Sequence, residues 1–194
     1  DYLKNMINGA GCAYLELLLV PAEMGCFETA IAKWNHSTGE IQGQTRQHAK
    51  LLGLMGIEKL IVGVNKMDSC GWSEQRFNEI KEEMTKMITI AGFKPKQVPF
   101  VPFSGFSGQN LIEKSDKMPW YKGFNVNLSK TETASGYTLL DALEKVARPP
   151  KRFPEKPLRI PINGIYKIKG VGDVITGRVE QGTVNAGDVV RVSR

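Results

Sequence analysis

A run of five apolar residues, 60–64, ends directly in the polar tetrapeptide Asn65-Lys66-Met67-Asp68. A short apolar run bounded by polar residues is typical of a strand that is buried on both faces of a parallel sheet. Open sheets of this kind bind ligands beyond the carboxyl ends of their strands. The run therefore predicts an α/β fold with a ligand site where this strand ends.

The side chains of this tetrapeptide suit guanine. The carboxylate of Asp68 can accept two parallel hydrogen bonds, from the ring N1–H and the 2-amino group, and adenine offers neither donor there. Such charge-assisted bonds contribute about 1.5–3 kcal/mol each, and a polar mismatch can discriminate by roughly 10⁴-fold. The methylenes of Lys66 can cover the ring, and the amide of Asn65 can join neighbouring loops. The alternative is a chance polar turn, for which three fixed letters have a probability of roughly a few per cent.

A second candidate contact, Ser104-Gly105-Phe106, also follows a predicted strand. A small residue and a glycine let the backbone approach a ligand closely, so their N–H groups could hold the guanine O6. Ser-Gly turns are common, and an ordinary structural turn is the alternative. The parallel placement of the two motifs at successive strand ends favours the guanine site.

Helical and strand patterns alternate through the first three quarters of the chain, which predicts a mostly parallel sheet with flanking helices over residues 1–150. In the longest predicted helix, apolar side chains recur every three or four residues behind the capping residue Ser73. The predicted helices are residues 2–8, 44–55, 73–91 and 138–146, and the predicted strands are residues 14–20, 60–64 and 98–103.

Four prolines between positions 149 and 157 interrupt this alternation, so residues 151–157 are predicted to be an extended linker. Beyond the linker, short apolar runs alternate with glycine-rich turns. Residues 158–194 are therefore expected to begin an all-β barrel domain that is incomplete in this chain. The runs predicted as strands are residues 158–162, 164–168, 173–179 and 189–192.

The chain of 194 residues has a net charge of +6 and a pI near 9.2. This mild basic excess is compatible with an RNA partner or with a merely solvated surface. Its three cysteines form no C-x-x-C pair, which favours a reducing cytosol, and we expect a cytoplasmic location. The longest apolar run, residues 17–22, is too short to span a bilayer, so no membrane partner is expected.

The sequence contains no G-x-x-x-x-G-K-[ST] motif to cradle phosphates. Residues 68–71 spell D-x-x-G, but the assignment of Asp68 to the base makes that match accidental. No catalytic residue and no metal ligand are therefore predicted in this chain, and it is expected not to hydrolyse a nucleotide alone.

With these motifs placed, the chain resembles the translational GTPases of the elongation factor 1-alpha and elongation factor Tu class. Within that class it is most similar to the elongation factor-like proteins of some microbial eukaryotes, because residues 30–44 and 167–174 match features of that subfamily. One departure is Phe106, where the class has Trp or Leu. The matching segments are residues 1–7, 43–48, 61–68, 104–106, 118–123 and 177–182.

The resemblance implies the later two-thirds of a GTP-binding domain, followed by the start of a second domain. It implies GTP and GDP as ligands, with Mg²⁺ held by residues expected upstream of this chain, as are the phosphate-binding and catalytic residues. It further implies GTP-dependent delivery of aminoacyl-tRNA to the ribosomal A site, with aminoacyl-tRNA, the ribosome and a guanine nucleotide exchange factor as partners.

Two other functions stay open. A termination or ribosome-rescue GTPase of the same superfamily would bind a protein factor in place of tRNA. A non-catalytic module that binds RNA or cytoskeletal filaments would have no need for two base-reading loops.

Overall fold

The computed structural model describes residues 13–31, 49, 51, 53–54, 57–129, 131–147 and 151–193. The chain divides into two compact units, Asp1–Arg148 (unit 1) and Pro149–Arg194 (unit 2). The predicted helix at residues 2–8 and most of the segment 30–44 lie outside the described residues.

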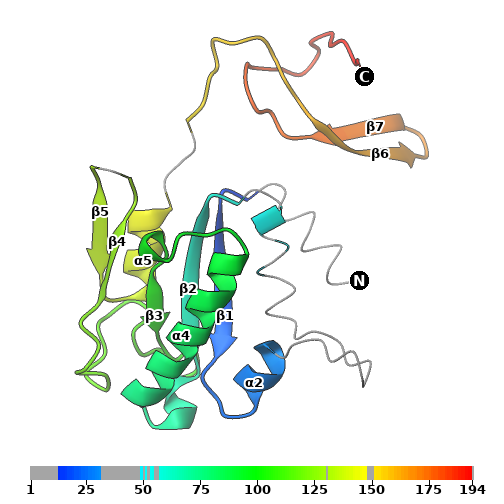
Figure 1. The fold of residues 1–194 in the computed structure, drawn as a ribbon. Helices are drawn as coiled ribbons and strands as arrows, with labels where there is room; N and C mark the ends of the chain where they lie inside the picture. The colour runs from blue at the N-terminus through cyan, green and yellow to red at the C-terminus, as the bar shows by residue number, and fades with distance from the viewer. Residues whose placement is uncertain are drawn as a thin grey trace. The chain divides into compact units, whose positions relative to one another are not determined.

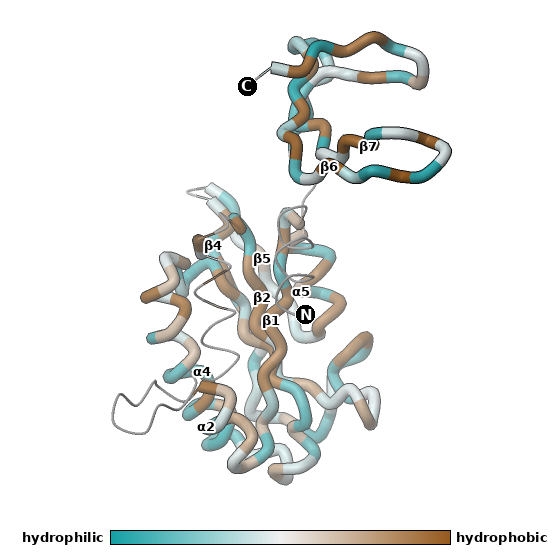
Figure 2. Tube along the Cα trace, turned by 90° about the vertical axis from the view of Figure 1, so that its right-hand side faces the viewer, coloured by the Kyte–Doolittle hydropathy of each residue, from teal (hydrophilic) through white to brown (hydrophobic). Residues whose placement is uncertain are grey.

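Unit 1 is built on a parallel sheet of three strands in the order β1 (Leu15–Pro21), β2 (Lys59–Asn65) and β3 (Phe100–Pro102) (Figure 1). Residues 60–64 of the central strand β2 are all buried. Hydrophobic positions run along β1 and β2 through the middle of the unit (Figure 2). The predicted α/β fold with a parallel sheet is confirmed, although only three described strands make up the sheet.

The long helix α4 (Glu74–Ile90) forms as the periodicity predicts. Its apolar side chains are buried in the core with β1 and β2 because they share one face of the helix. Ser73 caps the helix, since its Oγ accepts the backbone N–H of Arg76 at 3.3 Å. The buried apolar residues of α4 are Phe77, Ile80, Met84, Met87 and Ile88.

The predicted helix 138–146 is observed as α5 (Leu139–Val146). A capping box starts it: Thr138 Oγ1 accepts the N–H of Asp141, and the Asp141 carboxylate accepts the N–H of Thr138. Backbone donors, above all the N–H of Tyr137, lower the pKa of Asp141 to about 2. In the predicted helix 44–55, the described residues 49, 51, 53 and 54 are helical.

Five elements of unit 1 were not predicted. The short helix α2 (Cys26–Ile31) follows β1, and two 3₁₀ turns, η1 (Met67–Cys70) and η2 (Pro95–Gln97), precede α4 and β3. An antiparallel hairpin of β4 (Phe124–Asn127) and β5 (Thr133–Gly136) packs beside α5 and the sheet. Short elements of three to six residues carry too few residues to show a period in the sequence.

Unit 2 contains an antiparallel pair, β6 (Ile162–Ile168) and β7 (Gly172–Gly177), and an isolated bridge between Arg159 and Gln181. The predicted strand at residues 189–192 is wrong, because the structure pairs these described residues with no neighbouring strand. A strand needs a partner for its backbone groups, and here Val189 is 100% exposed. A closed barrel is not observed among the described residues and stays a prediction.

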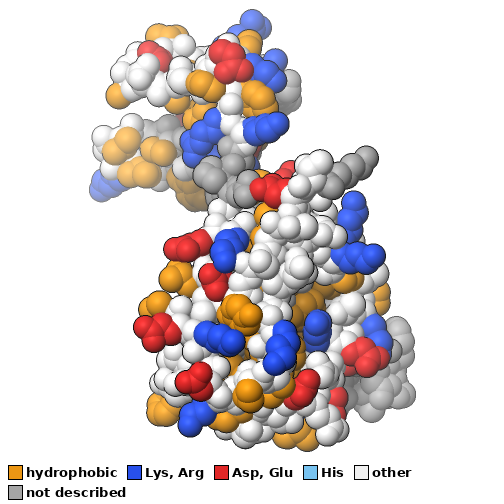
Figure 3. All heavy atoms as spheres, turned by 90° about the vertical axis from the view of Figure 1, so that its left-hand side faces the viewer, with side chains coloured by type: hydrophobic (Ala, Val, Ile, Leu, Met, Phe, Trp, Pro, Cys, Tyr) orange, Lys and Arg blue, Asp and Glu red, His pale blue; other side chains and the backbone are white. Residues whose placement is uncertain are grey.

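On the face of unit 1 that Figure 3 shows, charged side chains of both signs are spread over the surface, and several lysine and arginine side chains lie beside hydrophobic groups. Among the helices that the structure describes, none combines the length and apolar character needed to cross a membrane.

Candidate functional site

The loops that follow β2 and β3 lie side by side at the carboxyl ends of the sheet. The carbonyl of Val64 accepts the N–H of Phe103 at 2.9 Å, and the carbonyl of Phe103 accepts the N–H of Met67 at 3.2 Å. Beyond the strands, Asn65 Oδ1 accepts the N–H of Gly105 at 2.9 Å. Asn65 therefore joins the two loops, as its amide was expected to do.

The turn η1 holds the middle of the Asn-Lys-Met-Asp segment. Lys66 adopts the left-handed backbone conformation (φ 63°), and its N–H donates to Asn65 Oδ1 at 2.7 Å. The side chain of Met67 is fully buried in the core. A left-handed residue between a strand and a buried anchor turns the chain sharply, so Lys66 and Asp68 are both exposed.

The carboxylate of Asp68 is exposed in the first turn of η1. Among the described residues it makes no hydrogen bond or ion pair. Its two oxygens are therefore available as acceptors for a ligand that brings two N–H donors.

The ammonium of Lys66 pairs with the carboxylate of Glu23 at 2.8 Å. This hydrogen bond raises the pKa of Lys66 and lowers the pKa of Glu23. Both side chains are about half exposed, at 54% and 44%, so solvent screens the pair and a ligand can displace it.

The second loop differs from the expectation. The N–H of Ser104 donates to the carbonyl of Gln109 at 3.0 Å, and the N–H of Gly105 donates to Asn65. Both donors expected to face the guanine O6 are thus bonded within the protein, because the turn closes on itself and on the first loop. Ser104 is fully buried, and Phe106 is 98% exposed.

A third loop, residues 22–25 after β1, borders the candidate site. It was not assigned to the site from the sequence. The N–H of Ala22 donates to the carbonyl of Asn65 at 2.7 Å. The guanidinium of Arg76 donates to the carbonyls of Ala22 at 2.8 Å and Glu23 at 3.3 Å. The loop that carries Glu23 is therefore fixed to both β2 and α4.

Arg76 is only 7% exposed and is the buried hub of this arrangement. It pairs with Glu28 at 2.7 Å and lies over the ring of Phe27, 5.6 Å from its centroid. The hydrogen bond from Arg76 lowers the pKa of Glu28 to about 2. One clue was present in the sequence, since Arg76 lies on the apolar face of its helix, four residues before Ile80.

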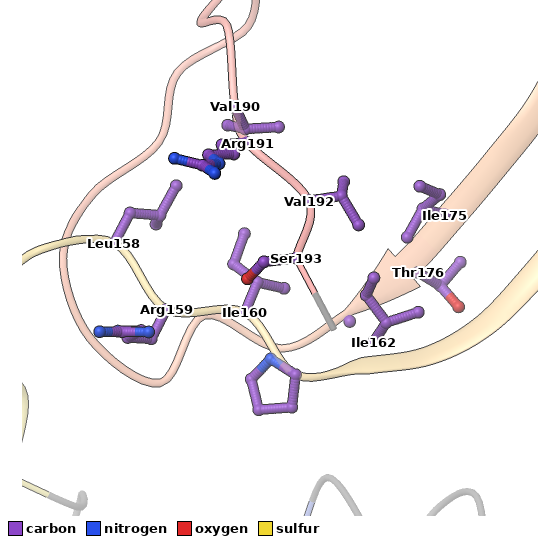
Figure 4. Close-up of a pocket in the computed structure, with 12 residues that line it drawn as sticks. Leu158, Arg159, Ile160, Ile162, Ile175, Thr176, Val190, Arg191, Val192 and Ser193 are labelled. Atoms are coloured by element: carbon purple, nitrogen blue, oxygen red, sulfur yellow. The ribbon is translucent and has the colours of Figure 1, made fainter.

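A different kind of hollow occurs in unit 2 (Figure 4). It has a volume of about 540 Å³, and aliphatic side chains such as Ile162, Ile175 and Val192 line much of it. Such a surface suits packing against other apolar groups rather than catalysis. For metals, the described residues contain no cluster of three or more His, Cys, Asp or Glu side chains able to hold an ion.

The chain matches the protein family described as Elongation factor Tu GTP binding domain over residues 1–149. It is 50% identical over 190 residues to an elongation factor 1-alpha of Absidia glauca and 48% identical to that of Coccidioides immitis. Each alignment covers 98% of this chain but only 39% of the relative, so the chain spans about two-fifths of these relatives' length.

Solved structures agree with the sequence relatives. A crystal structure of sup35 complexed with GDP is similar over 90% of this chain and 38% of that chain, with a TM-score of 0.56 and 31% identity. A second, of sup35 complexed with GMPPNP, has a TM-score of 0.54 and 30% identity, and covers 88% of this chain and 37% of that chain. The family match spans more than half of the sequence, and the chain belongs to the elongation factor Tu GTP-binding domain family.

Proposed function

We propose that this chain is part of a translation elongation factor that binds GTP and GDP and, as the full-length protein, hydrolyses GTP to deliver aminoacyl-tRNA to the ribosomal A site. Its family and its 45–50% identity to proteins named elongation factor 1-alpha support this function. Identity to the sup35 structures is lower, at 31% and 30%, so the relatives named elongation factor 1-alpha are the better guide to function.

The two joined loops are the proposed base site. The observation that carries the proposal is the 2.9 Å bond from the Gly105 N–H to Asn65 Oδ1, which brings both motifs to one edge of the sheet. Asp68 would accept the N1–H and 2-amino group of guanine with its exposed carboxylate. The stem of Lys66 would cover one ring face, with its ammonium near Glu23.

Recognition of the guanine O6 is proposed to differ from the sequence-based expectation. Because Asn65 Oδ1 already accepts two backbone N–H groups, the orientation of its amide is fixed. Its Nδ2 is then the donor that remains for a ligand. Exposed Phe106 can lie against the base or the sugar as an apolar contact.

The chain is proposed to cover the later part of the GTP-binding domain up to residue 150, a linker at residues 151–157 and the start of a β-barrel domain at residues 158–194. The residues that hold the phosphates and Mg²⁺ are proposed to lie in the remainder of the full-length protein, since the printed sequence has no phosphate-binding motif. The chain alone is then inactive. The ribosome and an exchange factor are proposed partners, in the cytoplasm.

Titration calorimetry of the full-length protein with GDP and ADP tests the base site. We expect GDP to bind at least about 10³-fold more tightly, because adenine leaves the Asp68 carboxylate unpaired. Equal affinities would refute the guanine assignment.

A second measurement separates the elongation role from nucleotide binding. The full-length protein with GTP should slow the spontaneous hydrolysis of the aminoacyl-tRNA ester, and with GDP it should not. If GDP selectivity holds but protection is absent, the base site stands and the carrier function fails.

A further inference from the structure

A groove of about 340 Å³ lies on unit 1 between α4, η2 and β4. None of the residues of the candidate base site lines it. Its lining combines lysine side chains with proline and aromatic residues.

The charged side chains that line this groove are positive. Lys81 of α4 and Lys96 of η2 line it, and none of its described lining residues is acidic. Nearby carboxylates on α4 are engaged elsewhere, since Glu82 and Glu83 pair with Lys86 at 2.9 and 2.8 Å. The groove therefore attracts anionic groups rather than cationic ones.

One wall of the groove is the backbone of a strand. Residues 123–126 all line it, and β4 pairs with β5 along one edge only. Phe124 and Val126 direct their side chains into the core, whereas Asn125 is exposed. Among the described residues no strand pairs with the other edge of β4, and the turn η2 lies beside β4 across the groove. An extended chain that enters the groove can therefore pair with this edge.

We propose that this groove binds an extended acidic segment of a partner protein. The segment would add as a strand to the free edge of β4, with its carboxylates on Lys81 and Lys96. A peptide fits better than RNA for a structural reason. The aromatic rings of the groove, Phe100, Tyr121 and Phe124, are each more than nine-tenths buried, so they cannot stack on bases.

A labelled eight-residue peptide of alternating Glu and Val is the probe, added to the full-length protein in fluorescence anisotropy. The Lys81→Ala/Lys96→Ala variant should bind about tenfold more weakly, since each exposed charge pair contributes modestly. The matched control, Lys114→Ala/Lys117→Ala, has the same net charge, lies outside the groove and should change affinity by less than about twofold. Equal losses in both variants would show only non-specific attraction and overturn the proposal.

Hydrogen exchange read by mass spectrometry tests the strand addition in the same complex. Peptide binding should slow exchange of the backbone amides at residues 124–126 and leave β6 unchanged. Binding without this protection would refute addition to β4. Tighter binding of an eight-residue uridine oligonucleotide, with the same dependence on Lys81 and Lys96, would identify RNA as the ligand and also overturn the proposal.

Discussion

Strands β2 and β6 have the same length of seven residues and a similar share of β-branched apolar residues, but they differ in how far their side chains are buried. In β2 five residues are buried, and Ile61 is fully inaccessible. In β6 none is buried, and Ile165 is 66% exposed. β2 has a parallel partner on each side and α4 against the core, whereas the only described strand that pairs with β6 is β7. Burial thus follows from the flanking elements, not from the apolar sequence itself.

The same difference explains why the candidate base site is in unit 1. Its polar side chains project from a rigid base, because Met67 and Ser104 beside them are fully buried. Loops placed on buried anchors hold their geometry without a ligand. The β6–β7 hairpin offers no comparable anchor.

The largest expected effect on stability is in the packed core. Ile80→Ala should lower the free energy of unfolding of unit 1 by about 3 kcal/mol, because Ile80 is fully buried and its loss leaves a cavity. Ile90→Ala, on the same helix but 78% exposed, should cost less than about 0.5 kcal/mol. Urea unfolding followed by tryptophan fluorescence measures both, since all three tryptophans belong to unit 1.

The contrast between the packed core and β6 would be contradicted if Ile165→Ala in β6 destabilised its hairpin as much as Ile80→Ala destabilises unit 1. Hydrogen exchange of the β6–β7 amides is the appropriate readout for that variant. We expect almost unchanged exchange rates there.

A smaller loss of unfolding free energy is expected at Arg76, beside the candidate site. Arg76→Leu should destabilise unit 1 by about 2 kcal/mol, chiefly because the carbonyl of Ala22 loses its buried partner. The pair with Glu28 adds less, since Glu28 is 51% exposed and screened by solvent. Lys86→Leu on the exposed face of α4 is the control, and a similar loss in both variants would deny Arg76 this special role.

The effect of pH on the unfolding free energy of unit 1 should be smaller still. The pKa of Glu28 is about 2 in the folded protein against an ordinary value of 4.5, so its contribution is complete above about pH 4.5 and is lost as the pH falls toward 2. Glu28→Gln should therefore flatten the loss of unfolding free energy between these pH values. The slope should not vanish, because the pKa of Asp141 is also about 2. Acid titration of tryptophan fluorescence with Glu82→Gln as the control checks this.

The smallest effect should come from the exposed Glu23–Lys66 pair beside the candidate site. Glu23→Gln removes the charge that faces Lys66 but keeps a hydrogen-bond acceptor, so GDP affinity of the full-length protein should fall by only about twofold. Calorimetry with Glu58→Gln as the control measures it. A loss of a hundredfold would mean that Glu23 positions Lys66 for the ligand.

The sequence predicted the elements whose pattern is long or strongly apolar. β2, α4 and the Ser73 cap are observed where the periodicity placed them, because local preference and burial agree there. The sequence did not predict the β4–β5 hairpin, whose strands have four residues each. It wrongly predicted a strand at residues 189–192, because pairing depends on a partner and not on composition.

The candidate site was predicted only in part. The two motifs at neighbouring strand ends could be recognised, because parallel strands bring their carboxyl ends together. The loop with Glu23 and the Arg76–Glu28 pair could not, since their contacts join residues about fifty positions apart. Nor does a sequence show that the N–H groups of Ser104 and Gly105 are already bonded.

The central claim is that Asp68 reads guanine, and the ratio of GDP to XDP affinity in Asp68→Asn of the full-length protein tests it most directly. Loss of two charge-assisted bonds should weaken GDP binding by about 10²–10⁴-fold. XDP should bind more tightly than to the unmodified protein, because an amide can donate to the 2-oxo group. Asp116→Asn, in the loop before β4, should leave both affinities unchanged. If Asp68→Asn also leaves both unchanged, Asp68 does not contact the base and the proposed site is wrong.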